Sequence, residues 1–174
     1  MVDLSGNNIG KSTFANEAAE AIYEFLVGNR DIDIIKLNWN NIRGHMGERI
    51  IDGLLQCLSV REVHLNNNLL GVAYDDKQPP ICKMAELLTN SKGLEYLDLS
   101  FNFIEQKSIF CISHGLKFTK SLKNIIVEGN PIGPGGLRFL VQAMNQNNSG
   151  AFNINMKEIE ADKDLKKSYK DVFD

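Results

Sequence analysis

One pattern of apolar and polar positions runs through most of the chain. Its clearest copy reads Leu94-x-x-Leu97-x-Leu99-x-x-Asn102-x-Ile104. The alternation before the asparagine is typical of a short strand with one buried face. The same motif recurs with its asparagine at positions 7, 40, 68, 102 and 130, in steps of 33, 28, 34 and 28 residues. A phrase that recurs at this spacing predicts a chain built from about five similar units.

Apolar residues at helical spacing follow each predicted strand. The first such segment runs from Phe14 to Leu26, with Ser12 as a candidate N-cap and Gly28 closing the helix. Strands that all run in one direction and are joined by helices predict a parallel sheet with right-handed crossovers, and therefore the α/β class. Helices need more lateral room than strands spaced about 4.8 Å apart. We therefore expect a right-handed horseshoe solenoid, with the parallel sheet on its concave face and the helices on its convex face.

The recurring asparagines have a predicted structural role. Each one stands where the chain leaves a strand, where a carboxamide can satisfy backbone groups of its own turn and of the neighbouring one. We therefore interpret them as a buried structural ladder and not as a binding site. The ladder consists of Asn7, Asn40, Asn68, Asn102 and Asn130.

The sequence of the repeated units resembles that of a known class of repeat proteins. The segments 2–10 and 128–136 are similar to the ribonuclease-inhibitor-like class of leucine-rich repeat proteins. The similarity extends over about residues 2–150. It implies the horseshoe described above, a mostly intracellular location, and a concave strand face that commonly holds another protein.

The same reading divides the chain in two. Residues 1–156 form the predicted leucine-rich repeat domain, with about five repeats and a terminal capping strand at 151–156. Residues 157–174 form a charged C-terminal cap or tail. Because the chain begins inside a unit, we expect a fragment of a longer repeat protein.

Composition narrows the functional classes. The net charge of −3 lacks the basic excess that is typical of nucleic-acid binders. No apolar run reaches the roughly 18 residues of a membrane span, and no secretory signal is visible. We expect a cytoplasmic protein that contacts neither nucleic acid nor membrane. The three cysteines, Cys57, Cys82 and Cys111, fit no metal or disulfide spacing and are interpreted as reduced helix-face residues.

No catalytic constellation is visible. The three histidines are scattered, and Asp75-Asp76 lacks the ligand spacing of a calcium loop. The segment 6–12 has three residues between its glycines, whereas a phosphate-binding P-loop needs four. We therefore expect no enzyme activity, no cofactor, no metal and no small-molecule substrate.

The third unit contains an insertion. Residues 71–80 are polar and end in paired prolines, which predicts a long loop between strand and helix. Whether Asp75–Pro80 is an inert excursion or an added partner contact stays open.

The outward positions of the predicted strands give the candidate site. They place aromatic side chains among charged ones, a composition that is typical of protein-contact hot spots. Alternatively, the aromatic residues cover the strand–loop edge or pack against missing repeats. The candidate partner-binding residues are Ile34, Lys36, Trp39, Glu62, His64, Tyr96, Asp98 and Phe101.

The leading functional prediction is a non-catalytic scaffold that binds a protein partner across the concave face. A preordered sheet loses little conformational entropy on docking. Two alternatives stay open. One is a small-GTPase regulator like the Ran activators, and the other is a structural module of a ciliary or cytoskeletal assembly.

Overall fold

The computed structural model describes residues 1–150 and 152–156. These residues form one sheet of six parallel strands, which lie side by side in chain order. This confirms the predicted α/β class and the parallel sheet. The strands are β1 Val2–Asp3, β2 Ile34–Lys36, β3 Glu62–His64, β4 Tyr96–Asp98, β5 Asn124–Ile126 and β6 Asn153–Asn155.

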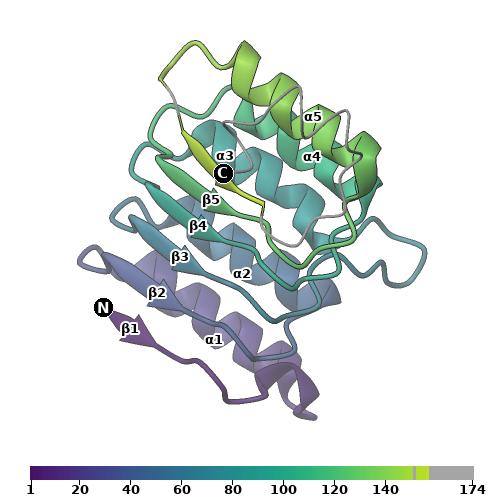
Figure 1. Cartoon of the computed structure of the whole chain (residues 1–174). Coiled ribbons are helices and arrows are strands. Elements are labelled where there is room, and N and C mark those ends of the chain that lie inside the picture. The colour runs from purple at the N-terminus through teal and green to yellow at the C-terminus, as the bar shows by residue number, and fades with distance from the viewer. Residues whose placement is uncertain (151, 157–174) are drawn as a thin grey trace.

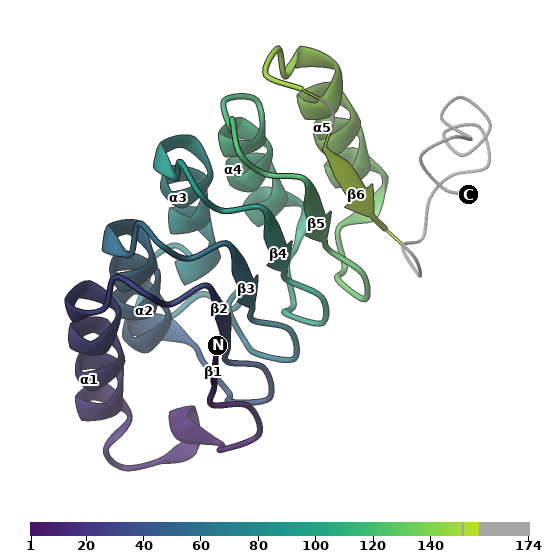
Figure 2. The same cartoon turned by 90° about the vertical axis from the view of Figure 1, so that its left-hand side faces the viewer.

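Helices connect consecutive strands and share one side of the sheet. Figure 1 shows them behind the strands, and Figure 2 shows the two layers edge-on. The α-helices are α1 Ala15–Gly28, α2 Gly44–Gln56, α3 Met84–Asn90, α4 Gln106–Leu116 and α5 Gly133–Gln146. Two short 3₁₀ helices precede α1 and α3, namely η1 Ile9–Lys11 and η2 Pro80–Lys83.

The hydrophobic core lies between these two layers. The central residue of each inner strand points toward the helices and is fully buried, as at Ile35, Val63, Leu97 and Ile125. Burial of large aliphatic side chains contributes roughly 1.5–3 kcal/mol each. The alternation that predicted the strands is therefore the alternation between this core and the opposite face.

The structure corrects the expected shape. The described residues form an open sheet covered by one helix layer, and a horseshoe solenoid is not shown. Curvature accumulates with each unit, and six strands spaced about 4.8 Å apart extend across only about 24 Å. The terms concave and convex are therefore replaced below by the strand face and the helix side.

Four ladder asparagines are buried, with exposed fractions of 0–5%. Asn68 shows the pattern. Its Nδ2 donates to the carbonyl of Leu65 in its own unit, at 2.8 Å, and to that of Leu37 in the preceding unit, at 3.0 Å. Its Oδ1 accepts from the backbone N–H groups of Asn40 and Ile42, at 3.1 and 2.9 Å. Each buried amide thus joins two neighbouring units through their backbones.

Asn7 differs from the other ladder residues. It is exposed, and its Nδ2 donates only within its own turn, to the carbonyls of Leu4 and Ser5. Its unit pairs with β2 on one side only, so no described unit covers its turn from the other side. The expected burial of the whole ladder is therefore wrong at this position.

Alternating charges line the edge where the strands begin. Arg61 lies between Asp33 and Glu95, with nitrogen–oxygen distances of 3.4 and 2.9 Å, and Lys123 contacts Glu95 at 2.6 Å. The Lys123 ammonium and then Arg61 lower the pKa of Glu95 below its ordinary value. These exposed pairs favour the observed strand neighbours while contributing little stability.

The fold brings two of the widely separated cysteines into contact. The Cys82 thiol of η2 interacts with the Cys111 thiol of α4, and both are free. Burial, followed by this neighbour, raises the pKa of Cys82 to about 12. The Cys82 thiol therefore stays protonated and unreactive at neutral pH. Separately, none of the described helices is long and apolar enough to cross a membrane.

Candidate protein-binding face

The strand face is the side of the sheet opposite the helices. The parallel register aligns its side chains in rows across the strands. One row contains Ile34, Glu62, Tyr96 and Asn124. The next row contains Asp3, Lys36, His64, Asp98 and Ile126. Six of the eight predicted site residues therefore lie together in two adjacent rows, and no described helix covers them (Figure 2).

The centre of the face is a polar and aromatic cluster. The rings of His64 and Tyr96 lie on adjacent strands, with their centroids 5.0 Å apart. His64 Nε2 is 3.7 Å from the Glu62 carboxylate. Burial, followed by the charges of Asp98 and Glu62, raises the pKa of Tyr96. The Tyr96 hydroxyl therefore remains a neutral hydrogen-bond donor at physiological pH.

The other two predicted residues, Trp39 and Phe101, lie just beyond the strands. We call the strand-exit turns that carry them the aromatic rim, which also includes Phe103. The exposed fractions of the three side chains are 60%, 42% and 57%. Exposed residues of this size bury large apolar area when a partner covers them. The strand face and the aromatic rim together form the candidate site.

The backbone of the aromatic rim is unusual. Trp39, Phe101 and Phe103 have φ angles of 59°, 53° and 58°, in the left-handed region. This conformation costs a residue with a side chain roughly 1–2 kcal/mol and is rare for bulky residues. It is fixed by the turn, because the N–H of Trp39 donates to Asn66 and that of Phe101 to Glu128 of the next unit. Strain of this kind is a pointer to function.

Phe103 was not among the residues predicted from the sequence. Its position follows the ladder asparagine, where the strand alternation has already ended. Asn8 and Asn41 have φ angles of 52° and 56° at the same position in their units. The signal that could have found it is a phenylalanine where two other units have asparagine, a residue that tolerates left-handed backbone.

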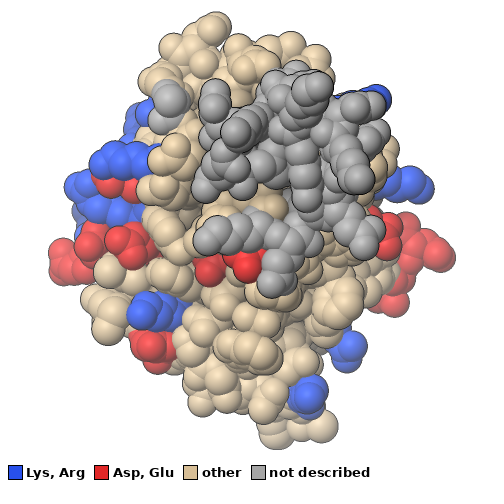
Figure 3. Space-filling model, viewed as in Figure 1, with Lys and Arg blue, Asp and Glu red and all other residues tan. Residues whose placement is uncertain are grey.

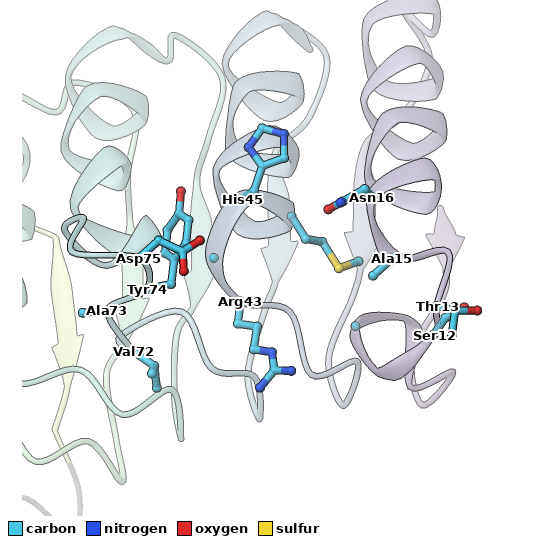
Figure 4. Close-up of a pocket in the computed structure, with 13 residues that line it drawn as sticks. Ser12, Thr13, Ala15, Asn16, Arg43, His45, Val72, Ala73, Tyr74 and Asp75 are labelled. Atoms are coloured by element: carbon cyan, nitrogen blue, oxygen red, sulfur yellow. The ribbon is translucent and has the colours of Figure 1, made fainter.

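A separate hollow of about 540 Å³ lies beside the beginnings of α1 and α2, where the chain passes from the strand-exit turns into the helices (Figure 4). Arg43, His45 and Ser12 line it together with the insertion loop at 72–75. The ring of Tyr74 packs on Gly44, where an added Cβ would lie 3.2 Å from the ring. The insertion is therefore packed onto the second unit. The hollow is wide and open, and no hydrogen bond joins Ser12 to His45 among its described lining residues.

The described residues contain no group of three or more His, Cys, Asp or Glu side chains that could hold a metal ion. The histidines stay apart: His45 is in the first turn of α2, His64 is in β3, and the ring of His114 in α4 meets that of Phe118 edge-on.

Comparison with known proteins gives a structural match only. No family model matches the chain, and no curated protein matches it. Among solved structures, the chain is similar to one described as Leiomodin-1 Actin-Binding Site 2 (ABS2), with a TM-score of 0.69. The match covers 92% of this chain and 87% of that one at 16% sequence identity, a level that shows a shared fold alone.

These comparisons correct the family assignment made from the sequence. The similar structure is described as an actin-binding site of leiomodin-1, and no family model places the chain in the ribonuclease-inhibitor-like class of leucine-rich repeat proteins. That assignment is wrong. The physical reason is that any stack of strand–helix units needs apolar residues for its core and an asparagine to bond the backbone of its turns. The motif therefore indicates how the units pack and does not identify a family. The description of the similar structure does not mention a small GTPase either.

Proposed function

We propose that this chain is a non-catalytic, cytoplasmic protein-interaction module that binds a partner protein through the strand face and the aromatic rim. The observation that carries the proposal is the joint exposure of Trp39 and Phe101 beside the rows of polar strand residues. Aromatic anchors surrounded by polar groups are typical of binding hot spots. Because the side chains stand on a hydrogen-bonded sheet, they are already ordered before a partner arrives.

The partner is proposed to belong to the cytoskeleton. The similar solved structure is named as an actin-binding site, which makes actin the first candidate to test. The argument for actin is the scaffold that the two chains share at 16% identity, and the binding assay below tests it. A cytoskeletal module is proposed ahead of a GTPase regulator because the similar solved structure is named as an actin-binding site.

A binding assay with face and control variants tests the proposal. The double variant Trp39→Ala/Phe101→Ala should lose at least about tenfold in affinity for monomeric or filamentous actin, because it removes the two largest exposed anchors. Its thermal unfolding should stay close to that of the wild type, since both side chains are largely outside the core. Co-sedimentation with filaments and fluorescence anisotropy with monomers measure the two affinities.

The matched control is Phe14→Ala/Phe118→Ala. Both phenylalanines are as exposed as the anchors, at 67% and 51%, but lie outside the strand face and the aromatic rim. This variant should bind like the wild type. Equal binding by the anchor variant would reject the proposed site, and an absence of actin binding by the wild type would reject actin as the partner.

A further inference from the structure

We infer that the aromatic rim receives the apolar side chains of a basic protein segment, one that carries lysine or arginine beside large apolar residues. The inference rests on the proposed function, since it names the chemistry of the partner at that same site. Two independent observations carry it. One is the left-handed backbone beneath three exposed aromatic side chains, and the other is the excess of carboxylates on the strand face.

The first observation comes from comparing equivalent positions of the chain's own units. The residue before the ladder asparagine has a left-handed φ in all five units, from 53° to 72°. Three of the units place Gly6, Asn67 and Gly129 there, which are the residue types that tolerate this conformation. The other two place Trp39 and Phe101 there. The turn itself therefore does not need an aromatic residue at this position.

Packing accounts for only part of Phe101. Its ring lies over Gly129, so close that a Cβ on that glycine would be 2.2 Å from Phe101 Cε1. Gly129 thus leaves room for the ring on one side, while 42% of the residue stays exposed. The exposed part of the ring is free to contact another molecule.

The second observation is the charge of the strand face. Among the outward residues that the structure describes, the carboxylates of Asp3, Glu62, Asp98 and Glu128 outnumber the single lysine or arginine, which is Lys36 on β2. Hydrogen bonds from Ser5 lower the pKa of the Asp3 carboxyl, and the charge of Lys36, its neighbour in the row, lowers it further. The excess negative charge therefore lies over β3 to β5.

The three carboxylates over β3 to β5 form no ion pair with a lysine or arginine of the described residues. Glu62 is near the His64 imidazole at 3.7 Å, and Asp98 accepts from Ser100, while neither they nor Glu128 form an ion pair with lysine or arginine in residues 1–150 and 152–156. Figure 3 shows acidic atoms in the middle of this face among uncharged ones, whereas blue and red atoms lie together along its left margin. Charge complementarity therefore favours a basic ligand segment.

Selection from a random peptide library tests this directly. The whole 174-residue chain is the bait, and the probe is a displayed library of random peptides of about 16 residues, long enough to lie across the sheet. Selected peptides should be enriched in lysine and arginine and should carry large apolar residues. Their affinity should fall with increasing salt, because ion pairs at exposed sites are screened.

Two variants separate the contributions. The rim variant Trp39→Asn/Phe101→Gly/Phe103→Asn copies residues that the other units have at these positions, so every left-handed backbone is retained. It should lose about tenfold or more in affinity, while its Tm equals or exceeds that of the wild type. The charge variant Glu62→Gln/Asp98→Asn/Glu128→Gln should lose about fivefold at low salt and much less at high salt. Phe14→Ala/Phe118→Ala is the control and should bind normally.

Each contrary result has a defined meaning. Selection of neutral or acidic peptides that still depend on the aromatic rim would overturn the basic-partner inference and leave the proposed face intact. Peptides that bind the rim variant as tightly as the wild type but fail to bind the control variant would overturn both the inference and the proposed binding face. A rim variant with a clearly lower Tm would show that the aromatic residues are structural. Failure to select any peptide, together with dimerisation of the chain, would assign the face to a second copy and overturn the inference.

Discussion

At the scale of single residues, the molecule depends on amides that join one unit to the next. The sequence predicted the position and role of this ladder because a buried turn leaves backbone groups that only a side chain with both a donor and an acceptor can satisfy. The sequence did not predict that Asn7 is exposed, because a local sequence motif does not indicate which units have a neighbouring unit on both sides. The left-handed backbone of Trp39 was equally hidden, because aromatic residues rarely adopt it.

Replacing one buried ladder residue tests this role. Asn68→Ala leaves two buried backbone carbonyls and two buried backbone N–H groups without the side chain that they bond. We therefore expect the free energy of unfolding to fall by about 3 kcal/mol or more. Asn7→Ala is the matched control, because water can replace the lost bonds of an exposed residue, and it should cost about 1 kcal/mol or less. Urea unfolding followed by circular dichroism measures both. Equal losses in the two variants would contradict the proposed role of burial.

At the scale of elements, strands and helices follow from sequence periodicity, whereas the distance between helices does not. Alternation and helical spacing predict where the elements occur because each has one apolar face. The close approach of α3 and α4 depends on Gly115, where a Cβ would lie 2.6 Å from the carbonyl oxygen of Ala85 and 2.7 Å from its Cα. The contact between Cys82 and Cys111 is another consequence of this packing. Neither could be predicted without knowing which helices are neighbours.

Gly115→Ala tests the close approach of the two helices. In an isolated helix the change would favour folding by about 0.8–1 kcal/mol. Here the clash is with backbone, which cannot move aside without shifting a helix, so overpacking of about 1–3 kcal/mol should outweigh that gain and lower the Tm. Gly28→Ala is the control, because no atom lies within 4 Å of its would-be Cβ, and it should be neutral or slightly stabilising. A Tm increase for Gly115→Ala would contradict the described packing.

At the scale of the whole molecule, the sequence predicted the α/β class and the alignment of the candidate residues on one face. These follow from strand register, which is fixed once one face of each strand is buried. The overall horseshoe could not be established, because curvature depends on the number of units and on small rotations between them. The family assignment failed for a related reason: the pattern describes how units pack, and different functions can be carried by the same packing.

The central claim is that a protein ligand covers the strand face and the aromatic rim. Hydroxyl-radical footprinting of the chain, alone and with bound actin or a selected peptide, tests it most directly. Trp39, Phe101 and Phe103 are readily oxidised when exposed, as are Phe14 and Phe118 outside the site. The account predicts that ligand protects the first three side chains and leaves the other two unchanged. Protection of Phe14 or Phe118 with no protection of Trp39 would contradict it.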